Sequence, residues 1–109
     1  MSRKQRGYDS QRIVADYLQA NGWDYALSAG AGRQGSDITG VAGIDWEVKA
    51  RRSVSLLAVL KQLKERKKQG MGIGVLRLDG QGEKSIDEWC AVLRLEDLVY
   101  LLKASGYGR

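Results

Sequence analysis

Residues 44–50 alternate apolar and charged side chains, reading Ile-Asp-Trp-Glu-Val-Lys-Ala. Successive side chains of a β-strand point to opposite faces of its sheet, so this alternation predicts a strand with one apolar and one charged face. Asp45, Glu47 and Lys49 share the charged face, which continues to Arg51. A chain of 109 residues is long enough for one modest hydrophobic core and too short for two. We therefore expect a single domain, residues 1–109, whose core covers the apolar face of this strand.

Helix-favouring and strand-favouring segments surround this central strand. The expected strands comprise residues 23–28, 36–41, 73–78 and 88–93, and the expected helices comprise residues 10–20, 56–69 and 95–103. Strands interleaved with helices are typical of an α/β domain with a central mixed sheet flanked by helices. Residues 1–7 are expected to form a flexible basic arm, with Asp9 as the N-cap of the first helix and Ser55 as the cap of the second.

Apolar residues recur at helical spacing in each expected helix. The side chains expected to face the core are Ile13, Val14, Tyr17 and Leu18 in the first helix, Leu56, Val59, Leu60 and Leu63 in the second, and Leu95, Leu98, Val99 and Leu102 in the third. The single cysteine, Cys90, is also expected to be a small core residue.

The residue types that are missing exclude several kinds of catalytic site. The chain has no His and one Cys, so it contains no Ser-His-Asp or Cys-His arrangement. One cysteine without histidine also cannot form a zinc knuckle, an iron–sulfur site or an internal disulfide. Any hydrolytic chemistry must therefore use carboxylates, amines, hydroxyls, amides or a hard metal ion.

A second carboxylate, Asp37, lies shortly before the central strand. A short turn joins the expected strand 36–41 to the central strand, so the two strands should pair as a hairpin that places Asp37 beside Glu47. Two neighbouring carboxylates repel each other unless a cation lies between them, and Mg²⁺ takes such oxygen ligands while it keeps several waters. Metal-held water is deprotonated near neutral pH, and Lys49 would orient this nucleophile or stabilise the charged transition state. The same pattern also fits a half-exposed strand with cross-strand ion pairs.

The net charge of +5 is unevenly distributed along the chain. Residues 1–70 hold 13 basic and 7 acidic side chains, whereas residues 71–109 hold 5 basic and 6 acidic ones. A basic surface favours a polyanion such as nucleic acid, although it also fits a merely solvated surface. No apolar run is long enough to span a membrane and no signal peptide is visible, so we expect no membrane partner. Together with a single cysteine, this favours a reducing cytoplasm.

Several short motifs occur in an order that resembles a known family. They are Gly7-Tyr-Asp-Ser-Gln11-Arg12, Asn21-Gly22-Trp23, Ser28-Ala-Gly30, Ser36-Asp37-Ile38, Glu47-Val-Lys49-Ala-Arg51 and Glu96-Asp97-Leu98-Val99. Together they resemble the archaeal-type Holliday junction resolvases of the PD-(D/E)XK nuclease superfamily, which also occur in phages. The resemblance implies a restriction-endonuclease-like αβββαβ core, with a central mixed sheet flanked by helices.

The resemblance also implies roles for individual residues. Asp37 and Glu47 would hold Mg²⁺, for which Mn²⁺ substitutes, with help from the carbonyl of Val48, and Lys49 would assist the attacking water. Ser28 lies in the loop where family members carry a functional serine.

Gln11 is the main departure from the family pattern, because it stands where the family has a glutamate. An amide oxygen still binds a metal ion or its water, but it brings no charge and cannot act as a base. This substitution leaves the number of metal ions open.

The implied activity is Mg²⁺-dependent cleavage of a four-way DNA junction in a prokaryotic or phage-infected cell. Two symmetric cuts need two sites, so we expect a homodimer. The residues expected to contact the DNA backbone are Arg3, Lys4, Arg6, Arg33, Arg51 and Arg52. Two alternatives remain open: another nuclease of the superfamily that acts on duplex or single-stranded DNA, and a non-catalytic nucleic-acid-binding module on the same fold.

Overall fold

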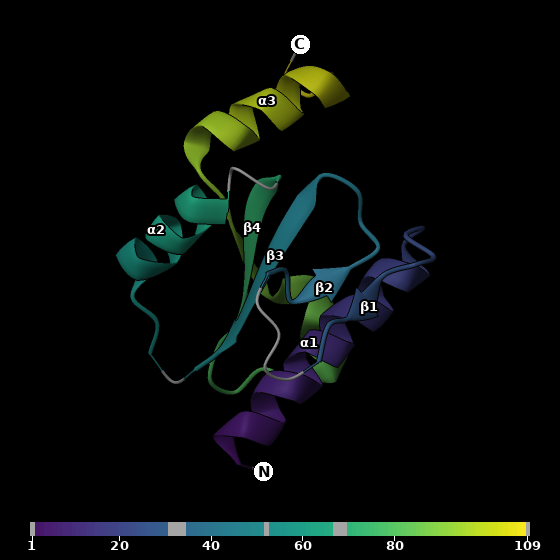
Figure 1. Ribbon diagram of the computed structural model, residues 1–109, viewed down its shortest axis with the longest axis vertical. Helices are drawn as coiled ribbons and strands as arrows, with labels where there is room; N and C mark the ends of the chain where they lie inside the picture. Colours follow the sequence, from purple (N-terminus) through teal and green to yellow (C-terminus); the bar gives the residue numbers. More distant parts are fainter. Residues whose placement is uncertain (1, 31–34, 52, 67–69, 109) are drawn as a thin grey trace.

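The central strand forms over the predicted residues, as β3 (Ile44–Ala50). The computed structural model describes residues 2–30, 35–51, 53–66 and 70–108. β3 pairs in parallel with β4 (Met71–Arg77), and β4 pairs antiparallel with β5 (Cys90–Val92). The result is a mixed three-stranded sheet in the order β3-β4-β5, which lies at the centre of the molecule (Figure 1).

The two strands before β3 are shorter than predicted. β1 (Leu27–Ser28) and β2 (Ile38–Thr39) pair with each other as a separate antiparallel two-stranded sheet. The prediction that β2 pairs with β3 as a hairpin is therefore wrong, because β2 forms its ladder with β1. Instead, residues 36–37 lie along the outer edge of β3, where the Asp37 amide donates to the Trp46 carbonyl at 2.9 Å.

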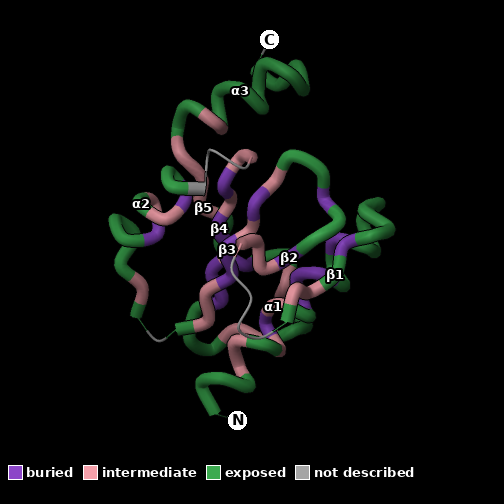
Figure 2. Tube along the Cα trace, in the orientation of Figure 1, coloured by how far each residue is buried: buried purple, intermediate pink, exposed green. Residues whose placement is uncertain are grey.

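Helix α1 (Arg3–Ala20) covers the apolar face of β3. Its buried Ile13, Val14 and Leu18 form one cluster with Val48, as predicted, whereas Tyr17 is exposed. Figure 2 shows the buried segments of α1 next to those of the central strands.

The start of α1 corrects two predictions. The helix begins at Arg3, so residues 3–7 are helical and do not form an arm. Ser2 is the N-cap: its side chain accepts from the Gln5 amide at 3.2 Å, and the Gln5 side chain accepts from the Ser2 amide at 3.0 Å. This reciprocal capping box satisfies the first free amides of the helix, so Asp9 lies in its interior.

Helix α2 (Leu56–Arg66) packs on the opposite face of the sheet from α1. The Ser55 hydroxyl accepts from the Ala58 amide at 3.3 Å, which confirms the predicted cap. Val59 and Leu63 are buried against Leu76 of β4 as predicted, but Leu56 is exposed. The helix approaches closely because β4 carries Gly72, where a Cβ would lie 2.8 Å from the Leu63 carbonyl oxygen.

The carboxyl-terminal part differs most from the sequence-based expectation. A 3₁₀ segment, η1 (Glu83–Glu88), precedes β5, and helix α3 (Leu95–Ser105) follows it. The predicted inward face of α3 is wrong, because the helix buries no residue within the part of the chain that the structure describes. Cys90, at the start of the three-residue strand β5, is exposed as well, so its predicted place in the core is wrong.

These elements confirm an α/β fold with a mixed sheet between helices. Within the described ranges, no helix is long and apolar enough to cross a membrane.

Candidate functional site

The charged side chains of β3 lie on the face of the sheet opposite α1. Ile44, Trp46 and Val48 pack into the cluster that α1 covers. Because side chains alternate along a strand, Asp45, Glu47 and Lys49 point to the other face. The register places them beside the Gly72, Gly74 and Leu76 positions of β4. The predicted division of β3 into an apolar and a charged face is therefore confirmed.

Glu47 and Lys49 form an ion pair that is largely removed from solvent. Lys49 Nζ lies 3.0 Å from Glu47 Oε1, and the exposed fractions of the two side chains are 16% and 8%. Their spacing of two residues on an extended strand brings them to the same face, where a lysine side chain reaches back to the carboxylate. Asp45 is also buried, at 4% exposure, so three ionisable groups lie along this one row.

Asp37 is held against β3 by its own side chain. Its Oδ2 accepts from the Val48 amide at 2.8 Å, and its amide donates to the Trp46 carbonyl. The preceding residue, Ser36, accepts from the Trp46 amide at 2.8 Å through its hydroxyl. These bonds supply partners for the outer edge of β3, and they place the Asp37 carboxylate next to the residue that follows Glu47.

Gln11 and Ser28 meet beside this edge. The Ser28 hydroxyl donates to Gln11 Oε1 at 3.5 Å, which is at the long limit for a hydrogen bond. Ser28 pairs with Ile38 in the two-stranded sheet, and the Ala29 amide donates to the Asp37 carbonyl at 2.9 Å. A continuous set of contacts therefore leads from α1 through β1 to Asp37 and on to β3.

The oxygen ligands in this set fit a hard cation such as Mg²⁺. A carboxylate offers about four lone-pair sites on its two oxygens, so an oxygen that accepts one hydrogen bond also has lone pairs for a cation. Mg²⁺ is commonly bound through one or two carboxylates with waters in its other positions. No group of three or more His, Cys, Asp or Glu side chains with metal-binding geometry occurs in residues 2–30, 35–51, 53–66 and 70–108. The candidate oxygen donors remain those predicted from the sequence, namely Asp37, Glu47, the Gln11 amide and the Val48 carbonyl. The contacts place Asp37 at the Val48 amide and Gln11 at Ser28.

Basic side chains gather at the carboxyl ends of the parallel strands. Arg51 is exposed directly after β3, and Arg6 Nη2 donates to the Leu78 carbonyl at 3.4 Å, directly after β4. Since Ala50 and Arg77 are register partners, these two arginines lie at the same end of the sheet. Arg3 and Lys4 are exposed in the first turn of α1 at this end, whereas the predicted Arg33 and Arg52 lie outside the described residues.

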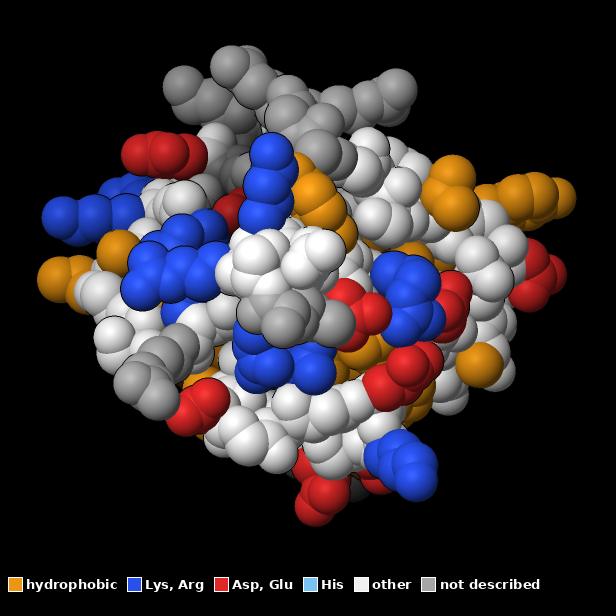
Figure 3. Space-filling view, turned by 90° about the horizontal axis from the view of Figure 1, so that it is seen from below, with side chains coloured by type: hydrophobic (Ala, Val, Ile, Leu, Met, Phe, Trp, Pro, Cys, Tyr) orange, Lys and Arg blue, Asp and Glu red, His pale blue; other side chains and the backbone are white. Residues whose placement is uncertain are grey.

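Figure 3 looks at this end of the molecule. Most Lys and Arg side chains lie on the left and at the centre of the view, and others lie on the right among the Asp and Glu side chains.

The sequence analysis missed a polar network that joins α1 to β4. Arg77 is buried at 8% exposure, where Nη1 lies 3.3 Å from Asp9 Oδ2 and 3.1 Å from the Ser10 hydroxyl. Its guanidinium also lies 5.3 Å from the centroid of the Trp89 ring. The one signal in the sequence is an arginine that interrupts the otherwise apolar segment of β4. This network fixes α1 on the sheet by charge-assisted hydrogen bonds and a cation–π contact.

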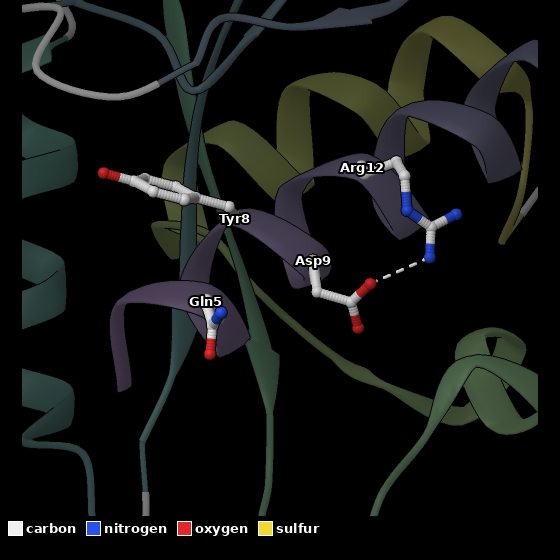
Figure 4. Close-up of a pocket in the computed structure, with 4 residues that line it drawn as sticks. All are labelled: Gln5, Tyr8, Asp9 and Arg12. Atoms are coloured by element: carbon white, nitrogen blue, oxygen red, sulfur yellow. Dashed lines mark hydrogen bonds and ion pairs between the residues drawn. The ribbon is translucent and has the colours of Figure 1, made fainter. Parts of the chain in front are cut away.

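Asp9 and Arg12 extend this network onto the outer surface of α1. Figure 4 shows them with Gln5 and Tyr8 around an open hollow, and Arg12 Nη2 lies 2.9 Å from Asp9 Oδ1. The hydrogen bond from Arg12, with a further one from Arg77, lowers the pKa of Asp9 below its usual value against the opposing effect of burial. Arg12 also pairs with Glu83 of η1, and these carboxylates raise its pKa.

Comparisons of this chain with protein-family models, curated proteins and solved structures give no match.

Proposed function

We propose that this protein is a Mg²⁺-dependent, structure-selective DNA endonuclease that resolves four-way junctions. One observation carries the proposal: a shielded Glu47–Lys49 pair lies on β3, and Asp37 is hydrogen-bonded to the intervening Val48 amide. This arrangement combines two carboxylates with an amine, which are among the hydrolytic groups available to a chain without histidine. We also propose that the fold is the restriction-endonuclease-like core of the family that the sequence resembles.

The cost of burying charge supports a chemical role for the pair. Removing two charged groups from water costs several kcal/mol per ion, and their mutual attraction often only offsets that cost. Apolar residues at positions 47 and 49 would stabilise the strand as well or better. Shielded carboxylate–amine pairs are typical of sites in which charge must be presented to a ligand, although structural ion pairs also occur.

Each residue has a specific task in the proposed reaction. Asp37 and Glu47 would hold Mg²⁺, which supplies an activated water and neutralises charge on the scissile phosphate. The Lys49 ammonium lies within 3.0 Å of Glu47 Oε1, so it is positioned to donate a hydrogen bond to the water or to a phosphate oxygen near that carboxylate. Gln11 and Ser28 would orient a water or phosphate oxygen without contributing charge.

Exposed and half-buried basic residues would bind the DNA backbone next to this site. Arg3, Lys4, Arg6 and Arg51 lie at the carboxyl ends of β3 and β4, with Lys49 one residue from the end of its strand. Contacts to phosphates position a duplex without reading its sequence, which suits selection by DNA shape. Two cuts in one junction require two such sites, so the proposed enzyme acts as a homodimer in the cytoplasm.

The decisive experiment incubates the protein with a synthetic four-way junction, its component duplex and a single strand, each with Mg²⁺ or EDTA. Paired symmetric nicks in the junction alone, which require Mg²⁺, are the expected result. Glu47→Gln and Asp37→Asn keep side-chain size but remove a ligand charge, and they should lower the cleavage rate on the order of 100-fold or more. Junction binding, measured separately in EDTA, should change little in these variants.

Glu65→Gln is the matched control, because Glu65 is exposed on α2 and the change also removes one negative charge. It should retain the cleavage rate of the parent protein. Equal cutting of the duplex would refute junction selectivity and favour another nuclease of this type. Binding to the junction without cleavage at any Mg²⁺ or Mn²⁺ concentration would refute the enzyme and identify a binding module.

A further inference from the structure

Helix α3 presents an apolar surface that its own chain does not cover. Leu95 is 74% exposed, and Leu98, Val99 and Leu102 are each more than one third exposed. These four residues recur at helical spacing and so form one face of the helix. In Figure 1, α3 lies beyond the end of the sheet, apart from the layers formed by α1 and α2, and in Figure 2 it is exposed over most of its length.

An isolated helix of this length has little stability of its own. Helices shorter than about 12–15 residues are marginal in water, and most helical stability in proteins comes from packing of an apolar face. α3 spans 11 residues and buries none of them among the described residues, although Gly106 gives it an αL C-cap at φ 80°. The helix therefore needs a partner surface.

The charges beside the apolar face of α3 would match those of a second copy of the helix in antiparallel orientation. Glu96 and Asp97 lie in the first turn, and Lys103 lies in the last turn. Glu96 and Lys103 are seven residues apart, so they lie along the same flank of the apolar face. Glu96 pairs with Arg94 of its own chain. When two copies of the helix pack antiparallel about a two-fold axis, this pair in each copy lies across from Lys103 of the other, which adds a second cation beside the Glu96 carboxylate. The macrodipoles of the two helices then also oppose each other favourably.

A hollow next to α3 continues the apolar surface onto α2. Its lining consists of Leu57, Leu60, Lys61, Lys64, Arg94 and Leu95. In an antiparallel pair, the carboxyl end of the partner helix lies beside Leu95 and hence beside this hollow. That end carries Tyr107, which is 77% exposed. The hollow thus offers an apolar floor and a basic rim to an exposed aromatic side chain.

We infer that α3 is a homodimer interface, in which the faces formed by Leu95, Leu98, Val99 and Leu102 of two copies pack antiparallel about a two-fold axis. The inference rests on the proposed function in one respect: cleavage of both strands of a junction needs two active sites. The α3 interface is the surface that would bring these two sites together. Because the oligomeric state is measured without DNA or metal, the dimer and the nuclease activity are tested separately.

Sedimentation equilibrium of the full chain tests the interface. The parent protein should sediment with the mass of two chains, and Leu102→Glu should be a monomer at concentrations where the parent is a dimer. Tyr100→Glu is the matched control, since Tyr100 is 66% exposed on another face of the same helix, and it should remain dimeric. Near-ultraviolet circular dichroism of the tryptophans verifies that each variant is folded.

A charge-reversal series tests the antiparallel arrangement without disturbing the apolar face. Glu96→Lys and Lys103→Glu should each raise the dimer dissociation constant at least about 10-fold, and the double variant should regain most of the parent affinity. A monomeric parent protein, a larger assembly or a dimeric Leu102→Glu would overturn the inference. Reversal variants that weaken the dimer without rescue in the double variant would overturn the antiparallel pairing.

Discussion

Helices α1 and α3 differ in a way that their sequences do not suggest: the less apolar helix, α1, buries more of its residues than the more apolar helix, α3. α1 contains the charged segment Arg3–Arg6, yet it buries five residues against the sheet. α3 is the more apolar helix, with five Leu or Val residues among eleven, and it buries none in its own chain. An apolar face shows that a helix needs a partner, but it does not tell where that partner lies. The position of the helix on the sheet decides this.

The largest effect should come from the face of α1. Ile13 is 2% exposed within the main cluster, so Ile13→Ala removes buried methylene groups and leaves a cavity. The free energy of unfolding should fall by about 2–5 kcal/mol. Urea denaturation followed by tryptophan fluorescence measures this change. A loss below about 1 kcal/mol would contradict the tight packing of α1 on β3.

An intermediate effect is expected where α2 touches β4. A Cβ on Gly72 would lie 2.8 Å from the Leu63 carbonyl oxygen, so Gly72→Ala forces the helix away from the strand. The expected cost is about 1–3 kcal/mol in unfolding free energy. Gly82→Ala is the control, because a Cβ there meets no atom within 4 Å and its φ is −132°. Equal effects of both substitutions would contradict the close approach.

A smaller effect, which depends on pH, is expected from the polar contacts of α1. Asp9→Asn takes the charged partner from buried Arg77 and should lower stability by about 1–2 kcal/mol near pH 7. Because the pKa of Asp9 is lower in the folded protein, its stabilising contribution is complete above the unfolded pKa of about 4 and is lost as pH falls through the folded value. The difference between parent and variant should therefore shrink below about pH 4.

Urea denaturation of both proteins across this pH range measures the difference. Asp24→Asn serves as the charge-matched control, since Asp24 is exposed in the turn after α1 and its substitution should change the unfolding free energy little. A difference that stays constant to low pH would show that Asp9 is not stabilised as the anion.

The smallest effect should come from α3. Leu102→Ala, measured at a protein concentration where the chain is monomeric, should change the unfolding free energy by no more than about 0.5 kcal/mol. If two copies pair through α3, this cost must grow with protein concentration, because dimer formation stabilises the folded state by mass action. A large cost in the monomer would show that the helix packs against its own chain.

Local patterns in the sequence identified most of the elements. The alternation of residues 44–50 predicted both the bounds of β3 and its two faces, and Ser55 predicted the start of α2. The early start of α1 was missed although the signal was present, since Ser2 and Gln5 have the three-residue spacing of a capping box. Short strands such as β1 and β2 carry too few residues for a pattern to fix their ends.

The candidate site was predicted in part. The spacing of Glu47 and Lys49 places them on one face of a strand, because that depends only on extended geometry. The bond from the Val48 amide to Asp37 requires residues 36–37, which precede β2, to lie along the outer edge of β3. The buried Arg77 network joins residues nearly seventy positions apart, so no local pattern predicts it.

The sequence by itself determined what each element is, because propensity, capping and the alternation of side chains act over a few neighbouring residues. It determined the charged row on β3 and the chemistry open to a chain without histidine. Only the tertiary structure decided which apolar faces are covered. α1 packs on β3 and α2 packs on β4, and within the described residues no side chain of α3 is buried. Burial results from contacts between distant segments, which compete for the same two faces of one small sheet.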